Sequence, residues 1–409
     1  MNALFKNNAF AFLFSGRLIS NMGDSLYAIA AMWLAYDLGG SSFYSGLAGF
    51  LTLLPEFFSF LVGPVVDRVA LKKVLIVPTL IQGLLVLLVP ILYLLHLLTV
   101  TGILIIMPLI GLFDLFPSPA ENVLIPRLFE KHSLVQANSA MSFAYQGTDL
   151  IFSAVGGILI ALIGAVSLYF IDSLTFVFAA ALFAFMNLGQ SKTSAPEKAK
   201  SYHADLVEGL HFVREPLIVR MLLPFLISNF VLGGVFAVFP AFSKQIGGSA
   251  VYGLLMSCYT AGFLIGTLLS SFVSRRLSMG AAVICGYGCS GVLWLLMDWS
   301  APYSVGLACT LLVLANIPIG ATNILFSSFF QIIPPAEMIG RVDAITESLI
   351  AAAMPLGSLA GGLLASRIGV HAIIISQAAV LALIGAYWLI TKKLRGLPDL
   401  AHLKNSQLW

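Results

Sequence analysis

Charge is the scarcest property of this sequence. Only 10% of its 409 residues are Asp, Glu, Lys or Arg, whereas hydrophobic residues make up 59%. A soluble domain is expected to have about 25% charged and roughly 45–50% apolar residues. A chain with so few charges cannot cover a water-exposed surface, so the composition excludes an ordinary soluble protein and predicts a protein that lies in a membrane.

Motifs of common enzyme chemistry are also missing. The sequence has no Walker A phosphate loop, no G-x-S-x-G turn and no HExxH pair. Its four cysteines all fall within apolar segments, which excludes a secreted disulfide framework and favours helix packing over a metal site. We therefore expect a protein that is not an enzyme or an ATP-driven pump and that uses no cofactor, no metal and no nucleic-acid partner.

Long apolar segments fill most of the chain. A helix needs roughly 20 residues to cross a hydrocarbon core about 30 Å thick, whereas a membrane barrel would show short alternating segments. The sequence therefore predicts an all-α integral membrane protein. We predict twelve membrane-spanning helices, at residues 10–36, 43–66, 74–96, 101–122, 137–163, 165–188, 217–242, 249–273, 279–298, 302–330, 342–366 and 370–391.

The positions of Lys and Arg predict the orientation of these helices. All 21 of these residues except Arg17, Lys244 and Arg367 fall on the side that holds both termini. Since cytoplasmic loops carry the excess of basic residues, both termini are predicted to be cytoplasmic, in a multi-pass protein of the inner (cytoplasmic) membrane. The first segment contains polar residues and no cleavage site, so we expect a retained helix rather than a signal peptide.

Two halves of the chain repeat each other. "LISN" occurs at Leu18–Asn21 and again at Leu226–Asn229, and each copy is followed after the same interval by "GGS". Further on, "GPVVDRVALKK" corresponds to "GTLLSSFVSRR", and a third match aligns Gly157 with Gly362 and Asn138 with Asp343. Because the order of the segments is preserved, we predict two six-helix halves in parallel orientation, related by an axis along the membrane normal.

These segments resemble the major facilitator superfamily. "GPVVDRVALKK" is similar to that superfamily's signature in the cytoplasmic loop between helices 2 and 3. "GRLISNMGDSL", "PSPAENVLIPRL" and "MPLGSLAGGLL" look like the branch that contains macrolide-efflux and enterobactin-exporter-like proteins. The resemblance implies the major facilitator fold. We predict an N-terminal half at residues 1–188, a cytoplasmic linker at 189–216, a C-terminal half at 217–392 and a cytoplasmic tail at 393–409.

The predicted linker changes in character along its length. Its first part, "QSKTSAPEKAKS", is polar and contains proline, as a flexible connection does. The second part has apolar residues at helical spacing, which predicts an amphipathic helix on the cytoplasmic surface of the membrane. The alternative is a tether that only joins the two halves.

Ionisable and polar residues inside the predicted spans are the candidate functional groups, because burying them in a membrane is costly. The resemblance implies that helices 1, 4, 7 and 10 line a central cavity. The predicted cavity residues are Arg17, Asn21, Asp24, Asp114, Asn229, Phe230, Phe236, Asn316, Asn323 and Phe326. The predicted proton-coupling residues are Asp24, Glu56 and Asp149. Each carboxyl could alternatively be a protonated structural group.

Arg17 requires a partner at its predicted depth. Counted at about 1.5 Å per residue from the cytoplasmic ends of helices 1 and 4, Arg17 and Asp114 lie at one level. We therefore predict that Arg17 pairs with Asp114, with Glu121 as the alternative partner. A third possibility is that Arg17 extends to the cytoplasmic interface.

The loop that resembles the superfamily signature is a candidate gate. In the superfamily, its acidic and basic residues hold the two halves together at the cytoplasmic face. The predicted gate residues are Gly63, Asp67, Arg68, Lys72, Lys73, Glu121 and Asp343. The alternative is that the charges of this loop only set the topology.

Together these features predict a secondary active transporter. Carboxyls in low dielectric bind and release protons near neutral pH, which favours proton-coupled export of an amphipathic organic compound such as a drug, a macrolide or a siderophore, by alternating access. The expected partners are that compound, protons and membrane lipids, and the protein is expected to be a monomer. A carrier of lipids or lysolipids with the same fold is the alternative, and an importer is a weaker one.

Overall fold

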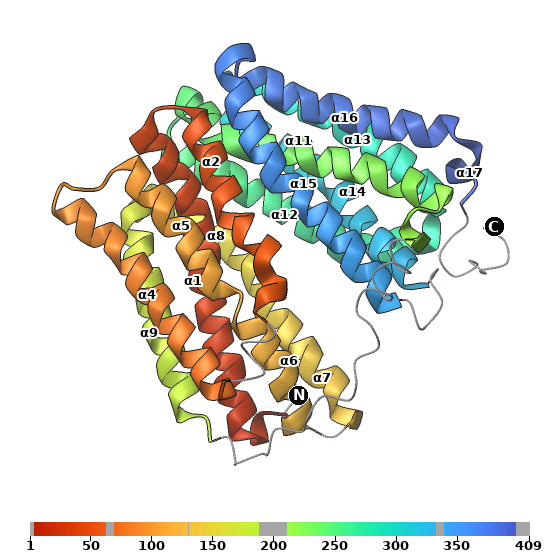
Figure 1. Cartoon of the computed structure of the whole chain (residues 1–409). Helices are drawn as coiled ribbons and strands as arrows, with labels where there is room; N and C mark the ends of the chain where they lie inside the picture. Colours follow the sequence, from red (N-terminus) through yellow and green to blue (C-terminus); the bar gives the residue numbers. More distant parts are fainter. Residues whose placement is uncertain (1–3, 63–68, 130, 188–210, 333–338, 398–409) are drawn as a thin grey trace. The chain divides into compact units, whose positions relative to one another are not determined.

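The computed structural model describes residues 4–62, 69–129, 131–187, 211–332 and 339–397, and this part of the chain is built almost entirely of helices (Figure 1). It divides into two compact units. Unit 1 comprises Met1–Thr193 with Gly247–Ser257, and unit 2 comprises Ser194–Ile246 with Cys258–Trp409. Most of the predicted linker and tail lies outside the described residues, so the predicted domain boundaries stay predictions.

Unit 1 holds the helices of the first half of the chain. After a short turn at Leu4–Lys6, the elements are α1 (Asn8–Gly39), α2 (Ser42–Leu53), η2 (Leu54–Leu61), α4 (Leu71–Leu94), α5 (Val100–Asp114), α6 (Pro117–Leu128), α7 (Lys131–Ser142), η3 (Phe143–Gly147), α8 (Thr148–Ile163) and α9 (Ala165–Phe185). η2 is a 3-10 helix and η3 is a π-helix, so the second and fifth predicted spans are not continuous α-helices.

Unit 2 holds most of the second half. Its elements are α11 (Pro216–Ile246), α12 (Ser249–Arg276), α13 (Met279–Ser300), α14 (Val305–Ile332), α15 (Ile339–Ile368), α16 (Val370–Ile390) and the short α17 (Lys392–Arg395). The first turns of α12 belong to unit 1.

Nine helical stretches in the described part of the chain are long and apolar enough to cross a membrane, with α5 and α6 counted together as one stretch, Val100–Leu128. The predicted spans outside this set are α1, the α2–η2 pair and the α7–η3–α8 series. Of these, α2 has 12 residues and α8 has 16, which is shorter than a crossing needs. The integral membrane fold is confirmed, and the count of twelve crossings stays a prediction.

The same pattern of helix contacts occurs in both units. In unit 1, α1 packs against α8 and α9, and α4 packs against α9 and α5. In unit 2, α11 packs against α15 and α16, and α13 packs against α16 and α14. These helices correspond one to one in the predicted repeat, so the repeated sequence folds into repeated packing, as in the major facilitator architecture.

The repeated "GGS" has a conformational cause. The second glycine of each copy, Gly40 and Gly248, has a positive φ of 68° and 79°. Gly40 ends α1 and its N–H donates to the carbonyl of Tyr36, while the hydroxyl of Ser41 caps the start of α2. Ser249 begins α12 in the same position. Each half thus needs glycine to turn from its first helix into its second.

A second pair of glycines extends the match. Gly164 joins α8 to α9 with φ 81° and ψ 156°, and Gly369 joins α15 to α16 with φ 87° and ψ 159°. This backbone region is open essentially to glycine alone. Gly164 and Gly369 each follow by seven positions the aligned pair Gly157 and Gly362, so the structure keeps the register that the sequence predicted.

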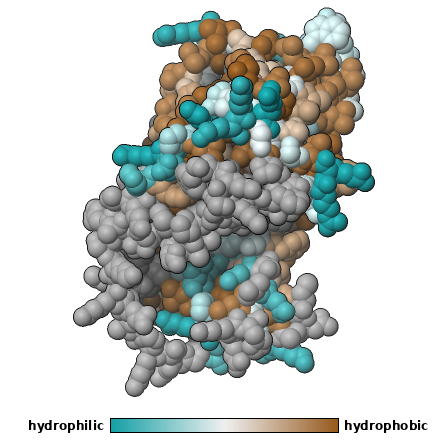
Figure 2. Space-filling view, turned by 90° about the vertical axis from the view of Figure 1, so that its right-hand side faces the viewer, coloured by the Kyte–Doolittle hydropathy of each residue, from teal (hydrophilic) through white to brown (hydrophobic). Residues whose placement is uncertain are grey.

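Hydrophobic side chains also cover the outside of the protein. Leu84, Leu268 and Leu383 are 64%, 73% and 66% exposed. On the face in Figure 2, hydrophobic residues make up most of the coloured surface, and hydrophilic residues gather in separate patches. An apolar surface of this extent is suited to contact with lipid rather than with water.

The turn glycines generate a direct test. Replacing Gly164 or Gly369 by Ala should destabilise the protein by about 1–3 kcal/mol, because the backbone conformation is strained for any other residue. A Cβ at either position would meet no atom within 4 Å, so the cost comes from the backbone alone. The measurement is the thermal unfolding midpoint in detergent.

The matched control for this test is Gly288→Ala. Gly288 lies inside α13, and a Cβ at this position would also meet no atom within 4 Å. Since Ala is the better helix former by about 1 kcal/mol, this variant should keep or raise the midpoint. If the unfolding midpoint fell equally in all three variants, the positive φ of Gly164 and Gly369 would not be the cause of the destabilisation.

Candidate functional site

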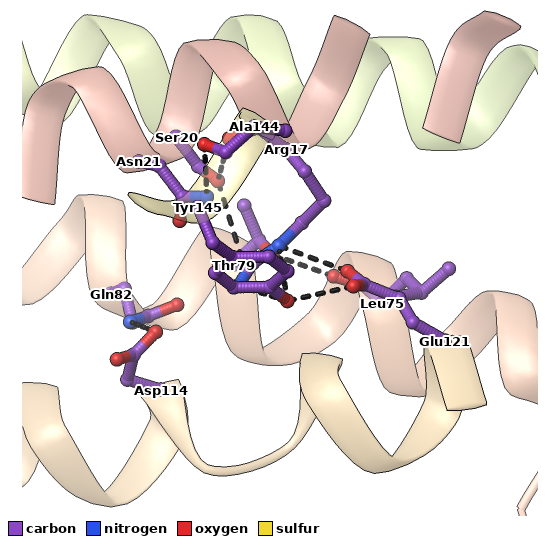
Figure 3. A network of polar contacts seen from close by, with 10 residues as sticks. All are labelled: Arg17, Ser20, Asn21, Leu75, Thr79, Gln82, Asp114, Glu121, Ala144 and Tyr145. Atoms are coloured by element: carbon purple, nitrogen blue, oxygen red, sulfur yellow. Dashed lines mark hydrogen bonds and ion pairs between the residues drawn. The ribbon is translucent and has the colours of Figure 1, made fainter. Parts of the chain in front are cut away.

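A buried ion pair lies inside unit 1 (Figure 3). Nε of Arg17, on α1, is 2.9 Å from Oε1 of Glu121, on α6, and both residues are 3% exposed. An unpaired charge at such a site would cost several kcal/mol, so each residue depends on the other. The structure thus contains the alternative partner that the sequence predicted for Arg17.

Tyr145 completes this pair. Its hydroxyl accepts hydrogen bonds from Nη2 of Arg17 at 2.7 Å and from Nε at 3.0 Å. The same hydroxyl donates to Oε2 of Glu121 at 2.7 Å, and the guanidinium carbon of Arg17 lies 4.6 Å from the centre of the tyrosine ring. One side chain therefore contacts the cation through its ring and bridges both charges through its hydroxyl.

The π-helix η3 positions Tyr145. A π-turn inserts a residue into the helix and leaves a backbone carbonyl without its usual partner, and such turns are frequent at functional sites. Here the side-chain amide of Asn21 donates to the carbonyl of Ala144 at 2.9 Å, in a buried position. Asn21, one turn along α1 from Arg17, therefore stabilises the turn that carries Tyr145.

Asp114 is not the partner of Arg17. It is the last residue of α5, is exposed, and accepts a hydrogen bond from Nε2 of Gln82 at 3.4 Å. The prediction of an Arg17–Asp114 pair assumed one continuous helix over residues 101–122. α5 instead ends at Asp114, and α6 starts anew at Pro117, so that Glu121 rather than Asp114 reaches Arg17.

The three predicted proton-coupling residues lie in different surroundings. Asp24 is half-buried on α1, whereas Glu56 on η2 and Asp149 on α8 are exposed. Asp24 interacts electrostatically with Asp114, Asp149 and Arg17. Glu56 interacts in the same way with Asp114. A set of acidic groups in unit 1 thus influences Asp24.

Sequence reasoning missed one member of this acidic set. Asp172 on α9 is 0% exposed, interacts electrostatically with Asp24 and lies against α1 at Gly23. It is the only charged residue of the predicted span 165–188. That isolation in an apolar run was the signal that could have identified it.

The predicted cavity residues of unit 2 make two kinds of contact. The aromatic residues Phe236 and Phe326 pack against other rings, and the amides Asn229 and Asn316 bind backbone carbonyls of their own helices. Phe326 is 6% exposed, and its ring centre lies 3.8 Å from that of Phe225 and 5.7 Å from that of Trp388. Phe236 packs edge-on against Tyr259, with ring centres 5.0 Å apart. Phe230 and Asn323 are exposed.

The other two amides of unit 2 bind their own helices. Asn229 donates to the carbonyl of Phe225 at 3.0 Å, and Asn316 donates to that of Leu312 at 2.8 Å. Asn316 is 0% exposed, and its side-chain oxygen has no hydrogen-bond partner within the described structure. The side-chain oxygen of Asn316 is thus a buried hydrogen-bond acceptor without a donor in the described structure.

The predicted gate is described only in part. Gly63, Asp67 and Arg68 lie outside the described residues, as does the side chain of Asp343. Lys73 is exposed, and Nζ of Lys72 donates to the carbonyl of Met186, just after α9, at 2.8 Å. Glu121, which the sequence also assigned to the gate, is instead buried in the pair with Arg17.

Comparison with known proteins identifies relatives over nearly the whole chain. The chain is 25% identical to the multidrug efflux pump Tap of Mycolicibacterium fortuitum over 402 residues, covering 94% of this chain and 95% of that protein. It is also 25% identical to macrolide efflux protein A of Streptococcus pyogenes over 367 residues, covering 88% and 90%.

Solved structures share the fold. A bacterial homologue of the iron transporter ferroportin, in an inward-facing state, matches with a TM-score of 0.69 at 15% identity, over 93% of this chain and 98% of that one. A bacterial homologue of the lysosomal transporter Spinster matches with a TM-score of 0.66 at 13% identity, over 95% of both chains. The family model described as "Transmembrane secretion effector" matches residues 2–408. The chain therefore belongs to this family of major facilitator superfamily transporters.

Proposed function

We propose that this protein exports an amphipathic organic compound across the cytoplasmic membrane in exchange for protons, by alternating access. Its family consists of membrane transporters rather than enzymes, and its relatives include pumps named for multidrug and macrolide efflux. These relatives favour a drug-like or macrolide-like substrate over a lipid. The proposal includes a monomeric protein with both termini in the cytoplasm.

The excess of acidic groups around Asp24 carries the proposal of proton coupling. Asp24 interacts with Asp114, Asp149 and Asp172 and with one cation, Arg17. Since Arg17 already pairs with Glu121, it cannot balance the other acids. Asp172 is fully buried and Asp24 is half-buried, and an ionised carboxyl without a counter-charge is costly in such surroundings. Groups of this kind can couple proton entry to the movement of another molecule.

The polar residues of the two units suit different parts of the task. Unit 1 provides the acidic groups and the Arg17–Glu121–Tyr145 network. Unit 2 provides aromatic rings at Phe326 and Phe236 and the amides Asn229 and Asn316. Aromatic faces attract organic cations and apolar rings, while amides form hydrogen bonds with neutral groups. We therefore assign proton binding to unit 1 and a large share of substrate binding to unit 2.

The decisive experiment uses the purified full chain in proteoliposomes with an imposed pH gradient. Macrolides are one set of probes, because a relative is named for macrolide efflux. Cationic dyes are the other set, because aromatic faces attract organic cations. Accumulation that depends on the gradient would support the proposal. Transport that is the same with and without the gradient, for every probe that moves, would reject proton coupling.

Neutralising the proposed proton-coupling residues should uncouple transport. Asp24→Asn, Glu56→Gln and Asp149→Asn each keep the size of the side chain and remove its ability to ionise. We expect loss of gradient-driven accumulation with unchanged folding, and the strongest effect at Asp24, the least exposed of the three. Dye accumulation in proteoliposomes is the measurement. Full activity in all three variants would rule out coupling through these groups.

Breaking the buried ion pair should destabilise the protein. Glu121→Gln leaves the Arg17 charge unpaired in unit 1, which typically costs about 3–5 kcal/mol. Tyr145→Phe removes one hydroxyl and should cost about 1–3 kcal/mol. Thermal unfolding in detergent measures both effects. Tyr303→Phe is the matched control, because Tyr303 is 80% exposed and its hydroxyl should contribute little.

A double substitution separates the pair from its surroundings. Arg17→Leu combined with Glu121→Leu removes both charges, so no unpaired group remains and the loss of stability should be smaller than the sum of the single losses. Additive losses would show that Arg17 and Glu121 do not depend on each other.

A further inference from the structure

Asp172 is a buried carboxyl with one unsatisfied oxygen. It lies in the middle of α9 and is 0% exposed. Thr175 donates to its Oδ1 at 3.3 Å, whereas Oδ2 has no hydrogen-bond partner in the described structure. A Cβ at Gly23 would stand 2.0 Å from Oδ1, so the carboxyl lies directly against the backbone of α1. Glycine at position 23 makes room for it.

Two tyrosines with unsatisfied hydroxyls meet at the same interface. Tyr27 is 5% exposed and Tyr169 is 0% exposed, and neither hydroxyl has a hydrogen-bond partner within the described residues. Their rings pack edge-on with centres 5.4 Å apart. Tyr27 lies one turn from Gly23 on α1, and Tyr169 lies one turn from Asp172 on α9, so all three polar groups belong to the contacting faces of these helices.

Among the residues that the structure describes, the charged neighbours of Asp172 do not include a free cation. Its acidic neighbours are Asp24 of α1 and Asp114 of α5, with both of which it interacts electrostatically. On α4, Lys72 donates a hydrogen bond to the carbonyl of Met186. Met186 follows Asp172 by 14 residues, which is about 20 Å along a helix.

The remaining neighbours do not neutralise Asp172 either. α8 contributes Asp149, which is also acidic, and Arg17 is paired with Glu121. An ionised carboxylate without a counter-charge is very costly in the interior. This cost favours the neutral form of Asp172.

We propose that Asp172, Tyr27 and Tyr169 form a buried proton-binding site between α1 and α9, and that this site exchanges its proton with Asp24. The proposal rests on the proposed proton coupling and names a second site for it. In the exchange, the O–H bond of the Asp172 carboxyl breaks and a new O–H bond forms on the ionised Asp24, so the total charge is unchanged.

The two hydroxyls suit a group that changes its protonation state. A phenol accepts a hydrogen bond from a neutral carboxyl and donates one to a carboxylate, so Tyr27 and Tyr169 would stabilise both forms of Asp172 once a hydroxyl comes within hydrogen-bond distance of Oδ2. In this structure neither hydroxyl makes that bond. A metal cation is a poorer match, because hard cations take about six or more oxygen ligands and these side chains offer four. Asp24, half-buried and next to Gly23 in the chain, provides the more accessible end of the exchange.

Infrared difference spectroscopy on the purified full-length protein tests the proton directly. At neutral pH we expect the wild type to show the carbonyl band of a protonated carboxylic acid. This band should disappear in Asp172→Asn and shift in Tyr27→Phe and in Tyr169→Phe. Asp298→Asn is the matched control, because Asp298 is a buried carboxyl of unit 2 that is hydrogen-bonded to His371. This control should keep the band.

Two results would overturn the proposed site. One is a carboxylic-acid spectrum that Asp172→Asn leaves unchanged. If Asp172→Asn does not fold, the second result decides instead: a carboxylic-acid band that is unchanged in both Tyr27→Phe and Tyr169→Phe would overturn the site. These outcomes depend only on the protonation of Asp172, so they hold whether or not the protein transports protons.

A transport assay tests the exchange with Asp24. With a fluorescent cationic dye in proteoliposomes, Asp172→Asn should lose accumulation driven by a pH gradient and keep dye exchange without a gradient. Asp298→Asn should keep both. Gradient-driven accumulation at the wild-type level in Asp172→Asn would overturn the exchange. If the wild type itself shows no gradient dependence, the proposed function fails, while the infrared result still decides the protonation of Asp172.

Discussion

The buried pair of Arg17 and Glu121 is the interaction on which the arrangement of unit 1 depends. Two charges in a membrane-embedded helix bundle are tolerated only when the pair is close and its remaining hydrogen-bonding groups are satisfied. Three separate segments meet this requirement. α1 supplies Arg17, α6 supplies Glu121, and the π-turn η3 supplies Tyr145, so the charge pair fixes how these segments meet.

The local irregularities of unit 1 follow from that constraint. α5 and α6 are separate helices because the chain breaks before Pro117, and this break lets Glu121 turn toward α1. The π-turn exposes the carbonyl of Ala144, and Asn21 satisfies it from the neighbouring turn of α1. The α5–α6 break and the π-turn are therefore each accompanied by a polar contact, as expected where backbone groups cannot reach water.

The sequence predicted the architecture better than the site, for a physical reason. Apolar run length and repeated turn glycines are local properties, so residues such as Gly40 and Gly248 could be interpreted without the fold. The partner of Arg17 depends on a helix break and a π-turn, which shift side chains by amounts that counting residues cannot follow. Asp172 could have been found as an isolated charge in an apolar run, but its tyrosine neighbours come from packing of α1 against α9.

The repeat also separates architecture from chemistry. Corresponding helices pack in the same way in both units, and corresponding glycines make the same turns, yet the polar groups differ. Where α1 carries Arg17 and Asp24, the equivalent positions of α11 carry Phe225 and Leu232, and Phe225 packs against Phe326. At these equivalent positions, the same helix packing thus holds ionisable side chains in α1 and apolar or aromatic side chains in α11. The Arg17–Glu121 pair holds α1, α6 and η3 together, whereas the packing that both units share does not require the other ionisable groups of unit 1, such as Asp24, which the proposed proton binding explains.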